Sequence, residues 1–401
     1  MTLHVLVATV PLTGHVRPMA MIVRALVDRG HRVTWTGARA FAGAIEAAGA
    51  RFVPPREAPD VDDARLAEQV AGLRGTRGLA RVRAELHGLF LAPMVAQLHD
   101  LQALAAGDPP DLLLADQAHL GAALLAETTG LPWVGLGVSA LGVRSRDTAP
   151  FGVARRPPRH AFARALDRLL AWTIDHVLFR SIHRAYRAGR VAAGLAAGDA
   201  GYFDLLASDL YLQPTVEAFE YPRRDLPPQV RFIGPLVPPP VEAVALPRWW
   251  PDVDATRAAG RPIVLVTQGT MATDPRELIV PALRALAAEE LLVVATTPPE
   301  TLGVEVPANA RVARHVPYQA LLAHARLMIT NGGYGGVQMA LAHGVPLVVA
   351  GGSEEKPEIA ARVAWSGAGV DLRTGRPRAR TIARAVRRVL GEPAFARRAG
   401  E

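Results

Sequence analysis

The chain has 401 residues, of which 50% are hydrophobic, and a formal net charge of +8. Single hydrophobic cores stop growing near ~250–300 residues, so this length predicts two domains. The absence of cysteine excludes disulfide bonds, thiolate catalysis and cysteine-ligated metal sites.

The amino-terminal stretch MTLHVLVATVPLTGHVRP passes from a strand-like run directly into a polar turn. It shows neither the basic head nor the small-residue cleavage site of a secretory signal. No segment approaches the ~20 uninterrupted apolar residues of a membrane span. A cytoplasmic protein is therefore expected.

The positive charge comes almost entirely from arginine, because Lys356 is the only lysine. Codon use in a GC-rich genome explains part of this excess, which weakens the prediction of a nucleic-acid partner. Nine arginines lie between Arg155 and Arg190, among apolar residues at helical spacing. Two interpretations of this segment stay open: a solvated helix face, or contact with a membrane surface or an anionic acceptor.

The first half alternates short apolar runs with amphipathic helical patterns, as in a parallel sheet with crossover helices. Strands are predicted at Leu3–Thr9, Arg32–Gly37, Leu112–Ala115 and Trp133–Leu136. Helices are predicted at His15–Arg29, Phe41–Ala48, Leu79–Ala106, His119–Thr129 and, as one long stretch, Arg159–Leu195.

A proline-rich segment at residues 215–258 predicts a linker, since proline disfavours helix and favours extended chain. It separates an amino-terminal domain, residues 1–214, from a carboxyl-terminal domain, residues 259–401. In the second domain strands are predicted at Ile263–Thr267, Leu291–Ala295, Leu327–Thr330 and Leu347–Ala350, and a helix at Pro275–Ala288. The expected fold class is α/β, with two Rossmann-like domains facing a cleft.

A glycine-rich loop, Asn331-Gly-Gly-Tyr-Gly-Gly336, follows the predicted strand Leu327–Thr330 and precedes a helical run. Backbone N–H groups at such a helix start can approach and bind an anion, so the loop predicts a diphosphate site. It lacks the lysine of a Walker loop and the spacing of a dinucleotide fingerprint, which disfavours ATPases and dehydrogenases. A tight strand-to-helix turn without a ligand is the alternative.

Two further turns follow strands of the same half. Thr267-Gln-Gly-Thr270 ends the first strand of this half. Glu355 and Lys356 follow a later strand and begin a helix. Carboxylates at this edge suit sugar hydroxyls, although glutamate also favours helix starts for electrostatic reasons alone.

His15 follows the first predicted strand, and Asp116 ends the strand at Leu112–Ala115. Histidine is the side chain whose ordinary pKa suits removal of a proton from a hydroxyl near neutral pH. A carboxylate beside it would hold the imidazole tautomer and stabilise the imidazolium. The alternatives are that each side chain caps a helix.

Through these residues the chain resembles the natural-product glycosyltransferases. This family includes the macrolide, antibiotic and flavonoid enzymes and has the GT-B fold. The resemblance covers almost the whole chain. Its most specific part runs from Val316-Pro-Tyr-Gln through the glycine loop and His343-Gly-Val-Pro to Glu355-Lys-Pro-Glu.

The resemblance implies a role for each matching position. His15 would be the catalytic base and Asp116 its partner. The residues implied in donor binding are Gly269, Thr270, His315, Val316, Asn331, Gly333, Gly335, Gly336, Glu355 and Lys356. Four of them depart from the family pattern: Asn331 replaces a histidine, Glu355-Lys356 replace Asp-Gln, and His315 replaces a tryptophan of plant members. The donor is therefore expected to be a UDP-sugar or a dTDP-sugar.

An apolar acceptor is expected on the first half, around Phe90, Ser139, Phe151 and Trp172. No metal site is expected, because the Asp60/Asp62 and Asp252/Asp254 pairs lie in proline-flanked segments rather than at strand ends. No cofactor beyond the sugar donor is implied.

The expected reaction is inverting, metal-independent transfer of a sugar from a nucleotide diphosphate to a hydroxyl of a polyketide, macrolide or flavonoid-like acceptor. A homodimer is compatible with the sequence, whereas nucleic acid and membrane are not favoured as partners. Two alternatives stay open: a peripheral membrane enzyme acting on a lipid, and a non-catalytic nucleotide-sugar-binding helper of another transferase.

Overall fold

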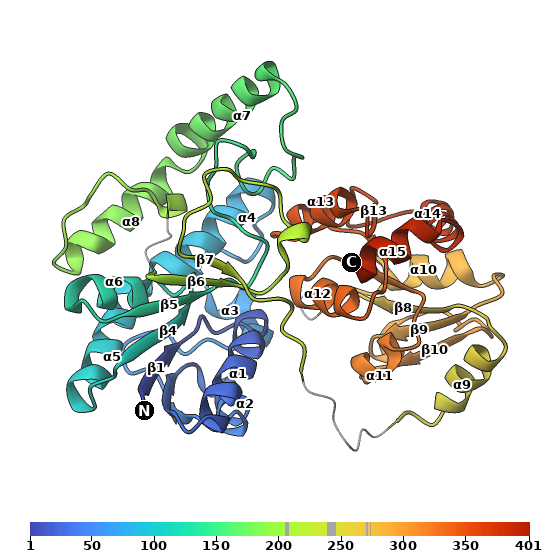
Figure 1. Ribbon diagram of the computed structural model, residues 1–401, viewed down its shortest axis with the longest axis horizontal. Helices are drawn as coiled ribbons and strands as arrows, with labels where there is room; N and C mark the ends of the chain where they lie inside the picture. Colours follow the sequence, from blue (N-terminus) through green and yellow to red (C-terminus); the bar gives the residue numbers. More distant parts are fainter. Residues whose placement is uncertain (205–207, 239–245, 270–271, 273) are drawn as a thin grey trace. The chain divides into compact units, whose positions relative to one another are not determined.

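The computed structural model describes residues 1–401 except 205–207, 239–245, 270–271 and 273. The chain forms two compact units, each with its own parallel sheet (Figure 1). The first unit comprises residues 1–150, 157–214 and 223–234, and the second comprises residues 151–156, 215–222 and 235–401.

The first unit contains a seven-stranded sheet in the order β3-β2-β1-β4-β5-β6-β7, with every neighbouring pair parallel. Its strands are β1 (His4–Ala8), β2 (Arg32–Thr36), β3 (Arg51–Val53), β4 (Leu112–Asp116), β5 (Trp133–Leu136), β6 (Leu210–Gln213) and β7 (Val230–Phe232). Its helices are α1 (Thr13–Asp28), α2 (Ala42–Ala47), α3 (Leu66–Gln69), α4 (Gly78–Glu85), α5 (Met94–Gly107), α6 (Leu120–Thr129), α7 (Ala161–Thr173) and α8 (Arg180–Ala192).

The second unit repeats this arrangement with the order β10-β9-β8-β11-β12-β13. Its strands are β8 (Ile263–Thr267), β9 (Leu292–Thr296), β10 (Ala310–Ala313), β11 (Leu327–Thr330), β12 (Leu347–Val349) and β13 (Gly369–Asp371). Its helices are α9 (Trp250–Ala258), α10 (Ile279–Leu286), α11 (Tyr318–Leu322), α12 (Tyr334–Ala342), α13 (Lys356–Ser366), α14 (Ala379–Gly391) and α15 (Pro393–Gly400).

Both sheets have the strand order of Rossmann domains, which reverses direction between β1 and β4 and between β8 and β11. Ligands bind at such reversal points, outside the carboxyl ends of the strands. The predicted α/β class with two Rossmann-like domains is confirmed. In each unit, the reversal point lies at the carboxyl edge of the sheet, where ligands bind in such folds.

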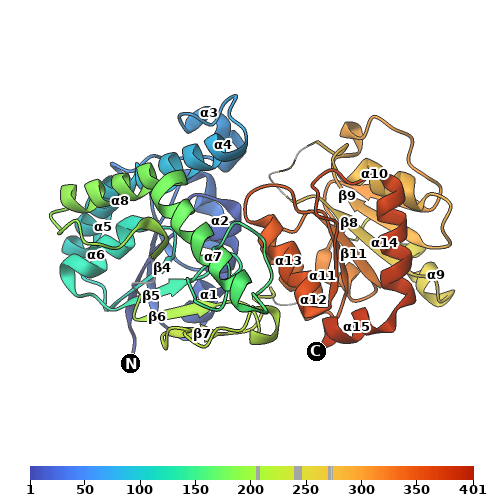
Figure 2. The same cartoon turned by 90° about the horizontal axis from the view of Figure 1, so that it is seen from above.

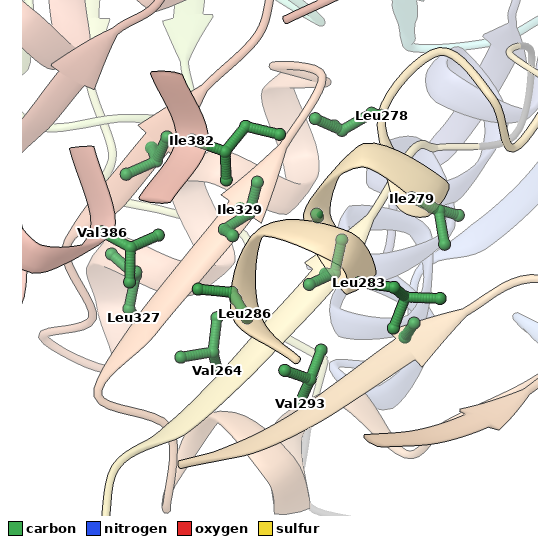
Figure 3. Packing of buried hydrophobic residues seen from close by; sticks show 14 of the residues in the cluster. Val264, Leu278, Ile279, Leu283, Leu286, Val293, Leu327, Ile329, Ile382 and Val386 are labelled. Atoms are coloured by element: carbon green, nitrogen blue, oxygen red, sulfur yellow. The ribbon is translucent and has the colours of Figure 1, made fainter. Parts of the chain in front are cut away.

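Helices cover both faces of each sheet, as Figure 2 shows for α10 and α14 on one side of the second sheet. The core of the second unit forms where these two helices pack on β8, β9 and β11 (Figure 3). Val264, Val293 and Ile329 from the strands meet Leu283 and Ile382 from the helices, and all five are buried. Burial of such side chains is the main stabilising contribution to the fold.

Two helical stretches contain π-helical turns. Pro93 has no N–H to donate, and just before it the Ala92 N–H bonds the His87 carbonyl five residues back, within η3 (Leu86–Leu91). The predicted helix over 159–195 is instead divided into α7, η4 (Ile174–Leu178) and α8, because Phe179 adopts φ −119° and ψ 19°.

The helical stretch 78–107 is, among the described residues, the one long and apolar enough to cross a membrane by length and composition. Its Met94, Leu98 and Leu101 are buried in the core of the first unit, packed with residues of α6. A core helix of a folded domain accounts for this composition.

Several short elements were not predicted from the sequence. Strands β3, β6, β7, β10 and β13 have only three or four residues each. The segment 215–258, interpreted as a linker, contains β7 and α9. The predicted helix at Pro275–Ala288 is shorter than expected, since α10 begins at Ile279.

Candidate active site

His15 lies in the first turn of α1, directly after β1 and the loop that follows it. Its side chain is 15% exposed. The helix start does not depend on the imidazole, because the Thr13 N–H donates to Asp63 Oδ2 at 2.7 Å. Capping of α1 therefore does not explain the position of His15.

Asp116 ends β4, the strand beside β1, and its side chain is fully buried. Oδ2 accepts the Val10 N–H at 2.7 Å, and Oδ1 accepts the Ala118 N–H at 2.9 Å. These two bonds fix the carboxylate at the point where the strand order reverses. Oδ1 also lies 3.3 Å from His15 Nδ1.

The carboxylate of Asp116 is held in its charged form. Burial by itself would raise the pKa of this group, but the neighbouring His15 charge, together with His119 and the Val10 N–H, outweighs burial and lowers it. The His15 Nδ1 atom is buried and is not aligned for a hydrogen bond with Oδ1. Contacts of this kind often tighten only when substrate binds.

The alternative role for Asp116, as the cap of the next helix, belongs to another residue. His119 is the N-cap of α6, where its Nδ1 accepts the Ala122 N–H at 3.2 Å. Burial is the largest influence on His119 and lowers its pKa, which favours the neutral imidazole that accepts this bond.

In the second unit the glycine loop leads from β11 into α12. Gly332 has φ +91°, and a Cβ there would lie 2.9 Å from Val349, so the fold itself requires glycine. At Gly333, the N-cap of α12, and at Gly335, a Cβ would meet no atom of the described residues within 4 Å. Gly336 is nearly as free, with one methionine methyl at 3.5 Å. Packing leaves these last three glycines unexplained, whereas close approach of a ligand to the backbone explains them.

Asn331 joins this loop to the turn after β8. Its Nδ2 donates to the Gln268 carbonyl, and its buried Oδ1 has no hydrogen-bond partner among the described residues. Gly269, at φ +75°, places its Cβ position 3.3 Å from that Oδ1. The two predicted donor turns thus meet at the second reversal point, while the predicted Thr270 lies outside the described residues.

The start of α13 carries the predicted sugar-contact residues. Glu355 is its N-cap, and the buried Lys356 forms an ion pair with Glu354. Glu354 was not singled out from the sequence, and it adopts φ +56°, which is unusual for a residue other than glycine. In the sequence, the feature that could have pointed to Glu354 is its position directly before Glu355.

His315 and Val316 follow β10 in the chain. The His315 side chain is exposed, and Val316 is buried. An exposed ring after a strand end is free to stack on a base, the role that the resemblance implies.

The structure places the four predicted acceptor residues in different surroundings. Phe90 packs against the core of the first unit, and Ser139 has a buried hydroxyl with no hydrogen-bond partner in the described part of the chain. Phe151 belongs to the second unit. Trp172 lies on the outside of α7 with its side chain 55% exposed.

Among the described residues, no group of three His, Asp or Glu side chains could hold a metal ion. Asp60 accepts the Arg39 N–H at 2.8 Å, and Asp62 caps a short helix. Asp252 pairs with Arg311 at 2.6 Å. Metal independence stays a prediction.

Solved structures share this two-unit architecture. The chain superposes on the glycosyltransferase of kitacinnamycin with a TM-score of 0.76 and 24% identity, over 99% of this chain and 93% of that one. It superposes on CalG4, the calicheamicin glycosyltransferase, with a TM-score of 0.75 and 24% identity, over 100% of this chain and 92% of that one. The fold is therefore that of GT-B glycosyltransferases.

Sequence relatives then define the family. The chain is 45% identical to 4'-demethylrebeccamycin synthase of Lentzea aerocolonigenes, over 98% of this chain and 93% of the relative. It is 32% identical to UDP-glucosyltransferase A1 of Starmerella bombicola, over 98% of this chain and 86% of the relative. Residues 278–401 match the family of the erythromycin biosynthesis protein CIII-like carboxyl-terminal domain. The chain belongs to the nucleotide-sugar-dependent natural-product glycosyltransferases.

Proposed function

We propose that the protein transfers a sugar, with inversion and without a metal ion, from a UDP- or dTDP-sugar to a hydroxyl of a small apolar natural product. The observation that carries this proposal is the placement of His15 beside the buried Asp116, 3.3 Å apart at the reversal point of the first sheet. An inverting displacement needs one base, and this pair supplies it.

In this mechanism the imidazole Nε2 takes the proton of the acceptor hydroxyl as its oxygen attacks the anomeric carbon. The bond from that carbon to the diphosphate oxygen breaks, and the leaving diphosphate takes the electron pair. Asp116 holds the Nδ1–H side of His15 and stabilises the imidazolium that forms. The backbone N–H groups at the start of α12 would receive the charge that develops on the leaving group.

The acceptor class follows from the relatives. The name of the Lentzea protein says that it makes 4'-demethylrebeccamycin, and the superposed structures are named for kitacinnamycin and calicheamicin. We propose an apolar natural-product aglycone as the acceptor of this chain.

The test replaces His15 with alanine and measures turnover and diphosphate binding separately. We expect His15→Ala to lower kcat by about 10²–10⁴-fold, the usual contribution of a general base, with the Kd for UDP or dTDP unchanged in calorimetry. His99→Ala is the matched control, because His99 is an exposed histidine of the same unit, paired with Glu57.

Full turnover of His15→Ala would overturn the role of His15. If the wild-type protein binds a diphosphate but transfers sugar to no acceptor in a broad panel, the helper function gains support instead. Repeating the assay with EDTA and with added magnesium tests metal independence, for which we expect equal rates.

A further inference from the structure

The outer side of α7 and η4 carries a line of apolar side chains. Phe162, Ala165, Leu169, Trp172 and His176 recur at intervals of three or four residues, which places them on one face of a helix. The rings of Trp172 and His176 stack with centroids 5.1 Å apart. We call this set the α7 stripe.

The α7 stripe faces solvent. Phe162 is 77% exposed, Leu169 58% and Trp172 55%. All six tryptophans lie within the described residues, and Trp172 alone among them is exposed. Asp167 lies on the opposite side of the helix and is buried, so the helix turns a charged side chain inward and its largest apolar side chains outward. Figure 1 shows α7 projecting from the first unit.

Exposed arginines accompany the stripe on α7, on the chain before it and on α8. They are Arg159, Arg164, Arg168, Arg180 and Arg184. In the part of the chain that the structure describes, no ion pair joins any of these five to a carboxylate. The acidic residues of the same segment are unavailable, because Asp167 is buried and Asp175 binds Arg144 at 2.5 and 2.8 Å. Within the segment 159–184, the exposed charged side chains are therefore all arginines.

From this geometry we propose that the α7 stripe binds the surface of an anionic lipid bilayer. The stripe is a line of exposed Phe, Leu and Trp side chains on one helix, accompanied by exposed arginines that form no ion pair among the described residues. This is the composition of helices that lie in the membrane interface. The apolar side chains enter the boundary between headgroups and acyl chains, and the arginines contact the anionic headgroups. Attachment is peripheral and reversible, and it is a function separate from catalysis at His15.

A second copy of the chain is a poorer occupant of the same surface. Two stripes packed together would bring Arg164 and Arg168 of one copy near the same arginines of the other. Like charges at close range disfavour such a contact, whereas an anionic surface neutralises them.

The test is co-sedimentation of the full-length protein with phosphatidylcholine vesicles and with vesicles that contain phosphatidylglycerol. We expect binding to the phosphatidylglycerol vesicles, which weakens as salt rises. Trp172→Ser with Phe162→Ser should lower the partition coefficient by tenfold or more, because two large apolar groups no longer enter the bilayer. Arg164→Gln with Arg168→Gln should lower it by roughly fivefold for each arginine, on anionic vesicles only.

Val306→Ser is the matched control, because Val306 is an exposed hydrophobic residue of the second unit. This variant should bind the vesicles as tightly as the wild type does. Circular dichroism and diphosphate titration of each variant establish that it is folded. Absence of wild-type binding to anionic vesicles would overturn the proposal. A dimer in light scattering that Trp172→Ser abolishes, without vesicle binding, would assign the stripe to a second copy instead.

Discussion

The glycines that follow β11 differ in what the fold requires of them. We predict that Gly333→Ala and Gly335→Ala leave the free energy of unfolding unchanged or slightly higher, since an added Cβ meets nothing within 4 Å. Both should weaken diphosphate binding by tenfold or more in calorimetry, because the methyl group occupies the space of the ligand.

The control for this prediction is Gly332→Ala, which should destabilise the protein, because Gly332 has φ +91° and its Cβ would lie 2.9 Å from Val349. Unchanged diphosphate affinity in both Gly333→Ala and Gly335→Ala would remove the ligand from the explanation of this loop.

Asp116 should make stability depend on pH. Its pKa in the folded protein is lowered, so the ionised carboxylate stabilises the fold above the ordinary aspartate pKa of about 4. This contribution is lost as the pH falls through the lowered pKa of the folded state. We predict that Asp116→Asn costs about 1–3 kcal/mol at pH 7 and that the difference from wild type shrinks toward pH 3, measured by urea denaturation. An equal difference at both pH values would contradict the assignment.

At the scale of elements, α13 organises two segments distant in the chain. Arg362 on this helix is 2% exposed and donates to Glu220 and to Glu358, both at 2.7 Å. Glu358 in turn accepts the N–H groups of Gly152 and Ala154 at 2.8 and 2.6 Å. One buried cation thus connects residues 151–156 and 215–222 to α13 within the second unit.

We predict that Arg362→Met destabilises the second unit by about 3–5 kcal/mol in chemical denaturation, because it removes the buried cation that Glu220 and Glu358 share. Adding Glu220→Gln should recover part of this loss, since one of the two buried negative charges is then removed. The exposed Arg387, paired with Glu289, provides the comparison, and Arg387→Met should cost less than about 1 kcal/mol. Equal losses for the two arginines would show that burial does not govern the contribution.

At the scale of the molecule, each unit has its own sheet and its own core. We predict that saturating diphosphate, at 100 times its Kd, stabilises the second unit by about 2.7 kcal/mol, because the glycine loop lies wholly within that unit. Hydrogen exchange followed by mass spectrometry should show slower exchange in β8 and β11 and unchanged exchange in β1 and β4. Equal slowing in both sheets would mean that the diphosphate site is not confined to the second unit.

Apolar runs and the periodicity of apolar residues were enough to predict β1, α1, β4 and β8, which have five residues or more, and also the short but apolar strands β11 and β12. They were not enough for β3 and β13, because Arg51 in one and Gly369 and Asp371 in the other leave too few apolar side chains to define a run or a period. The glycine loop after β11 was recognisable in the sequence because glycine allows backbone conformations and close approaches that other residues do not. The resemblance was enough to predict His15 and Asp116 as a pair, but the sequence by itself gave no distance between their side chains.

The sequence by itself determined the α/β class, the division into two sheets and the chemistry available at the ends of their strands. Only the tertiary structure decided which strands are neighbours, and this brings Asp116 within 3.3 Å of His15 across 100 residues of chain. Tertiary packing also decided that Asp167 is buried while Trp172 is exposed, because the same helical pattern leaves open which face meets the core. Local patterns record the preferences of each segment, whereas adjacency depends on how all segments pack together.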